Sequence, residues 1–406
     1  MSLNFDFYAT LVVIVLVLLL GFFITDKIKF LKDYNIPEPV VGGAIASIII
    51  LLIYSFGNIS IKFDNSFKDP LMLAFFASIG LLADFSSLKK GGKKLIIFLF
   101  VISGLLITQN IIGIGVASVM GQNPLIGMLG GSITMSGGHG TGAAWANEFI
   151  KAPYFFTPAT EVAIASATFG LIAGGIIGGP VARFLINKYD LKTKQEDNLS
   201  HEAILNFEEP QKEKLITPTS FIKSLALIGL CLLIGSYLSS WIKSSTGFTL
   251  PTFVYCLFVG VVLRNVLSIS KVHQVFDREV SVLGNVSLSL FLTFALMTVN
   301  LWELVSLALP ILVILIFQVI TMILYSIFIT FKFCGKDYDA AVLAAGHCGF
   351  GLGATPTAMV NMQAVTNHYG PSHMAFIIVP LCGAFFIDII NALIINAFLY
   401  LPFFAH

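Results

Sequence analysis

Two glycine-rich segments interrupt a chain that is otherwise strongly apolar, and they constrain the fold more than any other feature. The first runs from Gly130 to Gly142 (GGSITMSGGHGTG), and the second runs from Ala345 to Thr357 (AGHCGFGLGATPT). Broken backbone inside hydrocarbon leaves amide groups without hydrogen bonds unless it is buried in protein or lines a cavity. A matching pair of such interruptions in the two halves of a membrane chain points to a transport site.

The composition indicates a multi-pass membrane protein. Hydrophobic residues make up 57% of the chain and charged residues only 11%, whereas about a quarter of a typical soluble domain is charged. The segment from Phe7 to Ile24 has no charged residue and is long enough to cross a bilayer as a helix. It lacks a basic leading region and a small-residue cleavage site, so we expect no cleavable signal peptide.

Hydropathy predicts ten spanning helices, five in each half of the chain. The predicted spans are 7–25, 38–56, 70–86, 95–119, 158–186, 220–240, 250–268, 281–299, 305–331 and 374–402. With the N-terminus outside, the segments that fall in the cytoplasm hold 19 of the 23 Lys and Arg residues. This bias is the one the positive-inside rule requires, and it predicts that both termini lie outside and that the central loop is cytoplasmic.

The two halves are expected to form inverted repeats, 1–186 and 220–406, joined by a polar cytoplasmic linker at 187–219. Gly138 and Gly140 of the first glycine-rich segment align with Gly351 and Gly353 of the second. Five crossings is an odd number, so the halves run through the membrane in opposite directions. The loop between the third and fourth spans carries four lysines, and its counterpart in the second half carries none, as inverted topology requires.

Each glycine-rich segment is too polar and too broken for an ordinary span. We therefore predict two re-entrant hairpins, at 124–148 and 338–366, which enter from opposite sides and meet near the bilayer midplane. The alternative is that glycine here only lets helices pack closely. The predicted fold class is thus an all-α polytopic membrane protein made of two five-helix inverted-topology repeats, each with a re-entrant hairpin.

The hairpins supply hydroxyl groups, free backbone amides and histidines that suit a charged ligand. The candidate substrate-binding residues are Ser136, Gly137, Gly138, His139, Gly140, Thr141, Gly351, Gly353, Thr355, Asn361 and Asp388. Free N–H groups at a helix start favour a carboxylate. No further metal ligands accompany His139 or His347, so each is an uncharged hydrogen-bonded imidazole or a substrate contact.

Asp388 stands out because it lies near the middle of the last predicted span. An acidic side chain there costs about 2.5–3.5 kcal/mol on insertion scales, which makes it a functional candidate. Asn391 follows three residues later on the same helix face. The pair could bind a sodium ion or a substrate ammonium group, or serve only as a structural hydrogen bond. The sodium candidates are Thr134, Ser136, Thr355, Asn361, Asp388 and Asn391.

Several other functions are disfavoured by what the sequence lacks. The segment from Gly140 has no P-loop lysine, and no HExxH motif or paired CxxC motif occurs. An enzyme within the membrane would need a nucleophile–base pair or a metal set, and none is evident. A channel does not need antisymmetric halves, and no feature indicates a nucleic-acid partner.

At these residues the chain resembles the bacterial sodium/glutamate symporter family. The most specific stretches are Thr134 to Ala146 and Gly346 to Ala358. The resemblance implies uptake of L-glutamate across the bacterial inner membrane, driven by sodium through an alternating-access, elevator-like mechanism. It also implies a homodimer in which a scaffold domain holds a mobile transport domain, with sodium as coupling ion and no enzymatic cofactor. The alternative is a sodium- or proton-coupled carrier of another carboxylate, such as a hydroxy di- or tricarboxylate.

This resemblance gives the candidate residues expected roles. Glutamate has two carboxylates and one ammonium group. The carboxylates are expected to accept hydrogen bonds from the hairpin tips, with Ser136, Thr141 and Thr355 as first choices. Asp388 is expected to face the ammonium group or a sodium ion.

Overall fold

The computed structural model describes residues 2–34, 36–57, 59–85, 87–193, 216–246, 250–298, 301–401 and 404. It is almost entirely helical, apart from a two-stranded parallel pair of β1 (Ser2–Asn4) and β2 (Ser60–Lys62). Most of the predicted linker 187–219 lies outside the described residues.

The first half of the chain contains four long helices, one shorter span and one broken pair. In order, the elements are α1 (Phe7–Lys27), α2 (Lys29–Asp33), α3 (Glu38–Gly57), η1 (Asn65–Phe67), α4 (Lys68–Leu82), α5 (Ser87–Val119), α6 (Pro124–Met128), η2 (Leu129–Ile133), α7 (Gly138–Phe149) and α8 (Ala159–Tyr189). The broken pair is formed by α6 with η2 on one side and α7 on the other.

The second half follows the same plan. Its elements are α10 (Pro218–Thr246), α11 (Thr252–Ser270), α12 (Asp277–Met297), α13 (Leu301–Tyr325), η3 (Ser326–Thr330), α14 (Phe331–Phe333), α15 (Tyr338–Leu352), α16 (Thr355–Tyr369), α17 (His373–Leu381), η4 (Cys382–Phe386) and α18 (Ile387–Leu399). Here α15 and α16 form the broken pair.

Eight helices of the described chain are long and apolar enough to cross a membrane, which confirms the multi-pass membrane class. The other two predicted spans are shorter than expected. The third corresponds to α4, which has 15 residues. The tenth is divided by η4, a π-helical turn that follows Pro380 and contains Gly383. Proline lacks a backbone N–H donor and a π-turn leaves a carbonyl without its usual partner. The regular α-helix is therefore interrupted at this point.

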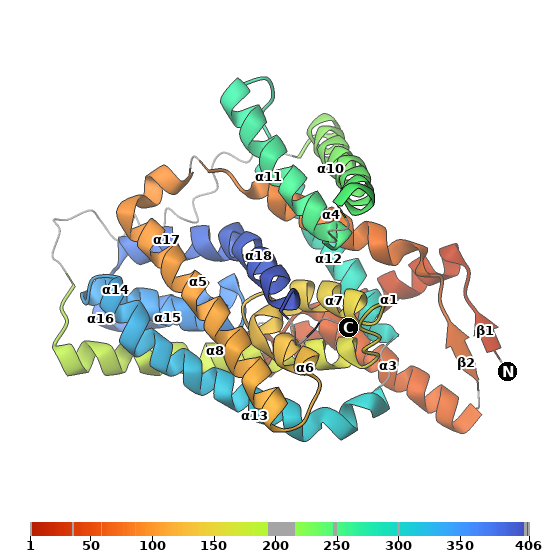
Figure 1. Cartoon of the computed structure of the whole chain (residues 1–406), viewed down its shortest axis with the longest axis horizontal. Coiled ribbons are helices and arrows are strands. Elements are labelled where there is room, and N and C mark those ends of the chain that lie inside the picture. The colour runs from red at the N-terminus through yellow and green to blue at the C-terminus, as the bar shows by residue number, and fades with distance from the viewer. Residues whose placement is uncertain are drawn as a thin grey trace.

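The helices form two groups that pack mainly within themselves (Figure 1). The six-helix group consists of α1, α3, α4, α10, α11 and α12. The broken-helix group consists of α5 to α8 and α13 to α18. Contacts between the groups are sparse and involve mainly α7 with α12 and α4 with η4. Each group therefore takes equivalent elements from both halves of the chain.

Local sequence explains why the broken pairs begin and end where they do. Asn123 caps α6 by accepting a hydrogen bond from the Leu125 backbone N–H at 2.9 Å, and Pro124 occupies the first turn. Asp337 caps α15 in the same way at the Ala340 N–H, also at 2.9 Å. Such side-chain caps satisfy backbone donors that a helix start leaves free.

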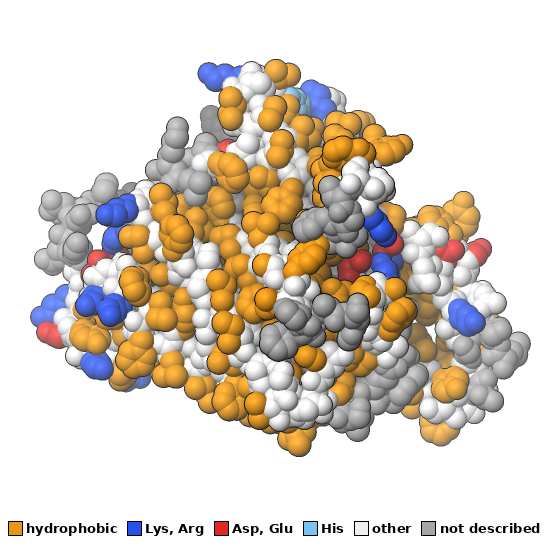
Figure 2. Space-filling model, viewed as in Figure 1, with side chains coloured by type: hydrophobic (Ala, Val, Ile, Leu, Met, Phe, Trp, Pro, Cys, Tyr) orange, Lys and Arg blue, Asp and Glu red, His pale blue; other side chains and the backbone are white. Residues whose placement is uncertain are grey.

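The surface suits a lipid environment. Large hydrophobic side chains are widely exposed, among them Phe100 at 76% and Tyr237 at 72%. Figure 2 shows hydrophobic side chains spread over the visible face, with Lys and Arg side chains gathered toward its edges. Exposed apolar surface of this extent would be unfavourable in water, and it is what a bilayer covers.

Candidate functional site

The two helix breaks lie side by side in the broken-helix group. Gly138 has a φ angle of +64°, a conformation that glycine adopts without strain. A Cβ atom at this position would lie 3.5 Å from the Gly353 carbonyl oxygen of the other break. Segments from opposite halves of the sequence thus meet at one point.

Gln109 of α5 connects both breaks. Its Nε2 donates to the Gly351 carbonyl at 2.7 Å, and its Oε1 accepts a hydrogen bond from the Ser136 hydroxyl at 2.7 Å. Its backbone carbonyl accepts a hydrogen bond from Gln318 of α13 at 2.7 Å. Because Gln109 is 1% exposed and Gln318 is fully buried, these bonds fix the relative positions of the breaks.

Two helix N-termini meet at this point without side-chain caps. Helix α7 begins after Gly137, and α16 begins after Ala354; neither residue provides a capping side chain. The first N–H groups of a helix lack intrahelical partners, and the helix dipole adds positive potential there. Helices of 12 and 15 residues therefore present two sites that favour negative charge.

A cavity of about 1060 Å³ lies between the two helix groups and reaches both N-termini. The broken-helix group contributes Ser136, Gly137, Gly138, His139, Gly140, Gly353, Ala354, Thr355, Pro356, Gly383 and Asp388. The facing wall comes from α1, the segment before α3, α4 and α12, including Ser281, Asn285 and Ser289. One end of the cavity reaches the exposed ion pair of Lys32 and Asp26.

Asp388 brings a carboxylate to this cavity. It lies in the first turn of α18, immediately after the π-helical turn η4. The Thr141 side chain of α7 hydrogen-bonds to it. In the same wall of the cavity, the Thr355 hydroxyl donates to the Gly383 carbonyl of η4 at 2.7 Å. The break in the last helix thus positions one acidic group beside both N-termini.

A buried polar cluster lies behind the first break. The Ser132 N–H donates to Asn110 Oδ1 at 2.9 Å, and Asn391 Nδ2 donates to the Ser132 carbonyl at 2.8 Å. All three residues are fully buried. Within the described residues, Ser132 Oγ, Asn391 Oδ1 and Asn110 Nδ2 have no hydrogen-bond partner. Unpartnered buried polar atoms cost free energy, so these three atoms favour a small polar ligand.

The structure brings only some of the predicted residues to the cavity. Thr141 is connected to the site by its hydrogen bond with Asp388, which lines the cavity. The Gly351 carbonyl accepts a hydrogen bond from Gln109. The Thr134 hydroxyl donates to the Leu129 carbonyl within its own turn at 2.5 Å. Asn361 donates to the Gly174 carbonyl of α8 at 2.9 Å. Neither of these last two residues lines the cavity.

The two predicted histidines differ in location. His139 lines the cavity, and its Nε2 lies 3.0 Å from the Thr168 hydroxyl of α8. His347 is fully buried, with Nδ1 2.9 Å from the Thr330 hydroxyl and its ring against Phe98 and Phe350. His139 therefore remains a candidate for substrate contact, and His347 packs in the core.

The sequence analysis did not predict the buried Gln and Asn side chains behind the breaks. It also did not predict the polar face of α12 on the opposite wall of the cavity. Gln109, Asn110 and Gln318 lie inside otherwise apolar spans, and polar residues in such spans often join helices. Ser281, Asn285 and Ser289 recur every four residues on α12. That spacing puts them on one helix face and could have indicated a cavity wall.

Comparisons of the sequence with known proteins agree with one another over most of the chain. The model of the family described as "Sodium/glutamate symporter" matches residues 3–371. The chain is 56% identical over 402 residues to the sodium/glutamate symporter of Escherichia coli (strain K12), covering 99% of each. It is 52% identical over 396 residues to the sodium/glutamate symporter of Haemophilus influenzae, covering 98% of each.

Among solved structures, the sodium/proton antiporter MjNhaP1 of Methanocaldococcus jannaschii aligns with a TM-score of 0.41 and 14% identity. The alignment covers 98% of this chain and 99% of the antiporter. The sequence matches are far stronger and span the broken pairs and the cavity. The chain therefore belongs to the sodium/glutamate symporter family, a family of transporters and not of enzymes.

Proposed function

We propose that the chain takes up L-glutamate together with sodium, and that the cavity between the two helix groups is the substrate site. The relatives are named for sodium and glutamate. The observation that carries the proposal is the convergence of two uncapped helix N-termini and one carboxylate at a single cavity. Glutamate has two carboxylates and one ammonium group, which matches this arrangement group for group.

The two carboxylates of glutamate would bind at the two N-termini. The first N–H groups of α7 belong to Gly138, His139 and Gly140, and those of α16 begin at Thr355. Each carboxylate exchanges water for backbone donors that have no other partner, with the helix dipole in its favour. The Ser136 and Thr355 side chains line the same cavity and add hydroxyl groups.

Asp388 would bind the ammonium group. It lines the cavity beside the N-terminal half of α7 and is oriented by Thr141. A hydroxy acid of similar shape lacks the ammonium group and would leave this carboxylate unpaired. Because an unpaired buried charge is strongly unfavourable, Asp388 favours an amino acid over a hydroxy acid.

Sodium would bind behind the first break, with Ser132 Oγ and Asn391 Oδ1 as ligands. Both are oxygen atoms without partners among the described residues, and hard cations prefer oxygen ligands. Both atoms are buried from solvent, so the ion would bind there without its hydration shell. Asn391 is three residues from Asp388, so the ion's charge would offset the negative charge of the site. Of the predicted ligands, Thr134, Ser136, Thr355 and Asn361 already have hydrogen-bond partners.

Substrate and ion would therefore stabilise each other. The sodium ion fixes Ser132 and the first break, and the substrate anion sits at the N-terminus that follows it. Such coupling is reciprocal, so each ligand raises the affinity for the other by the same factor.

Alternating access would occur by displacement of the broken-helix group against the six-helix group, in an elevator-like motion. Sparse contacts between the groups and a cavity at their boundary support this division. We further propose that the halves are inverted repeats with re-entrant hairpins, that both termini lie outside, and that the six-helix group forms a homodimer. In that orientation the cavity end at Lys32 and Asp26 opens to the cytoplasm.

Uptake of labelled glutamate into proteoliposomes tests the proposal. We expect accumulation with an inward sodium gradient and little with potassium in its place. Excess unlabelled glutamate should abolish uptake, whereas a hydroxy dicarboxylate of matched length should compete weakly. Equal uptake with and without a sodium gradient would exclude symport, and strong competition by the hydroxy acid would exclude the role given to Asp388.

A further inference from the structure

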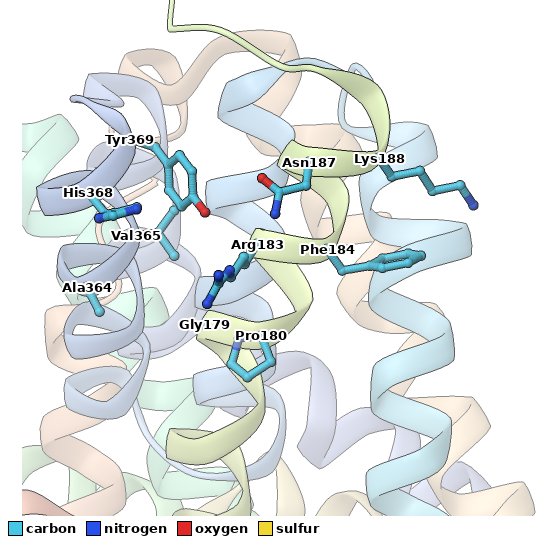
Figure 3. Close-up of a pocket in the computed structure, with 10 residues that line it drawn as sticks. All are labelled: Gly179, Pro180, Arg183, Phe184, Asn187, Lys188, Ala364, Val365, His368 and Tyr369. Carbon is cyan, nitrogen blue, oxygen red and sulfur yellow. The ribbon is translucent and has the colours of Figure 1, made fainter.

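A second hollow lies far from the substrate site, between the C-terminal halves of α8 and α16 (Figure 3). This α8–α16 groove has a volume of about 960 Å³ and shares no lining residue with the substrate cavity. Its lining residues are Gly179, Pro180, Arg183, Phe184, Asn187, Lys188, Ala364, Val365, His368 and Tyr369. It therefore needs an explanation of its own.

Among the described residues, the groove is lined by basic side chains and by no Asp or Glu. The basic residues are Arg183, Lys188 and His368, of which Lys188 projects away from α16 (Figure 3). Figure 3 shows the Arg183 side chain projecting from α8 toward α16, on the same side as Asn187. Among the described residues, Arg183 forms no ion pair. An unpaired guanidinium with neighbouring donors favours a bidentate anion such as a phosphate group.

The remainder of the groove is apolar and continues along the helix. Pro180 and Val365 line it, and Ile176, one turn before Pro180 on α8, is 52% exposed. Helix α8 has 31 residues, about 46 Å in length, whereas the hydrocarbon core is about 30 Å thick. With the start of α8 at the outer surface, as in the orientation proposed above, its last turns would reach the level of the lipid headgroups, with an apolar track below them.

We propose that the α8–α16 groove binds an anionic phospholipid. The phosphate lies at Arg183, with Asn187 and His368 nearby, and one acyl chain follows Pro180 and Ile176. Basic grooves between membrane helices are suited to anionic headgroups. In the orientation proposed above, this end of α8 faces the cytoplasmic leaflet. The lipid contacts α16, whose other end begins at the substrate cavity.

Lys188 provides a matched control. It lies on the same helix, but its side chain projects from the opposite flank together with Phe184 (Figure 3). Its ammonium nitrogen lies 5.2 Å from the centre of the Phe184 ring and 5.5 Å from that of Tyr189. Arg183→Gln and Lys188→Gln each remove one positive charge from the C-terminal half of α8, and we expect a large effect only from the side chain that projects toward α16.

Native mass spectrometry of the purified full-length chain with phosphatidylglycerol or phosphatidylcholine tests the proposal. We expect preferential retention of phosphatidylglycerol by the wild type. Arg183→Gln should reduce that retention about ten-fold or more, the effect of losing a charge-assisted hydrogen-bonded pair. Lys188→Gln should change it by less than about five-fold. Equal losses in both variants, or no preference between the two lipids, would overturn the proposal.

A second pair of variants blocks the groove without changing charge. A Cβ atom at Gly179 meets nothing within 4 Å, and the same holds at Gly229 on α10. Gly179→Leu should fill the groove and reduce phosphatidylglycerol retention, whereas Gly229→Leu should not. Displacement of the lipid by free glycerol phosphate at equal concentration would assign the groove to a soluble anion instead.

Discussion

The two broken helix pairs occupy equivalent places in the two halves of the chain, yet they carry different chemistry. In the first pair, the break extends over four residues after η2 and has a buried cluster of unpartnered polar atoms behind it. In the second pair, the break consists of Gly353 and Ala354 alone. Behind it lies His347, packed against Phe98 and Phe350.

This difference teaches that two segments with the same order of elements can carry different chemistry. Both pairs direct an uncapped helix N-terminus at the same cavity. The carboxylate of Asp388 and the polar cluster at Ser132 both belong to the side of the first pair. We therefore expect each pair to bind one substrate carboxylate, and the first pair to couple the cation to the substrate as well.

The largest effect is expected from Asp388→Asn. Removing this charge takes away the partner proposed for the substrate ammonium group, a loss of about 2–5 kcal/mol, so glutamate transport should fall by about two orders of magnitude. Asp26→Asn is the control, because Asp26 lines the same cavity at its exposed end. Transport assays in proteoliposomes measure both. Similar rates for the two variants would contradict a specific role for Asp388.

Loss of the Ser132 hydroxyl should show whether the first pair alone determines the sodium dependence of uptake. Ser132→Ala removes a proposed sodium ligand and should raise the sodium concentration for half-maximal uptake about ten-fold. Thr357→Val is the matched control in the second pair, because the Thr357 hydroxyl is also buried and unpartnered. It should leave sodium dependence nearly unchanged. Equal shifts in both variants would place the ion elsewhere.

The sequence allowed the class of fold to be predicted because hydropathy is a local property. Eight predicted spans correspond to long apolar helices. The broken pairs run from Pro124 to Phe149 and from Tyr338 to Tyr369, close to the predicted segments 124–148 and 338–366. Their insertion from opposite sides of the membrane stays a prediction.

What the sequence did not reveal depends on contacts between distant segments. Nothing local indicates that Gln109 of α5 joins Gly351 and Gln318. The π-turn that brings Gly383 to Thr355 was likewise not expected. Conversely, Asn361 was predicted at the site from its position alone, and the structure shows it bonded to the Gly174 carbonyl of α8. Periodicity identifies helix faces, but it does not identify which face meets which.

The two pairs should also differ in how far a glycine-to-alanine substitution lowers the unfolding temperature of the protein. A Cβ atom at Gly349 of α15 would lie 2.4 Å from the Ala358 Cα of α16, so Gly349→Ala forces two backbones apart. Overpacking of this kind costs about 1–3 kcal/mol. In the first pair, a Cβ atom at Gly142 would lie no closer than 3.0 Å to its nearest neighbour, the Thr134 methyl carbon, and 3.5 Å from the Ala163 Cβ. Gly142→Ala should therefore lower the unfolding temperature in detergent less than Gly349→Ala, and the reverse order would contradict the tighter packing of the second pair.

The smallest effect is expected at the helix caps, where the two pairs are most alike. Asn123→Ala and Asp337→Ala each remove a side chain that caps the first helix of a pair, at a cost of about 1 kcal/mol. Asp337 also lies 3.5 Å from the Lys94 ammonium group, with both side chains about one-third exposed, and such a pair contributes little. Asp337→Asn keeps the capping oxygen and loses the charge, so it should be nearly neutral in thermal unfolding. If it destabilised the protein as much as Asp337→Ala, the ion pair and not the cap would hold the start of α15, and the two pairs would differ there too.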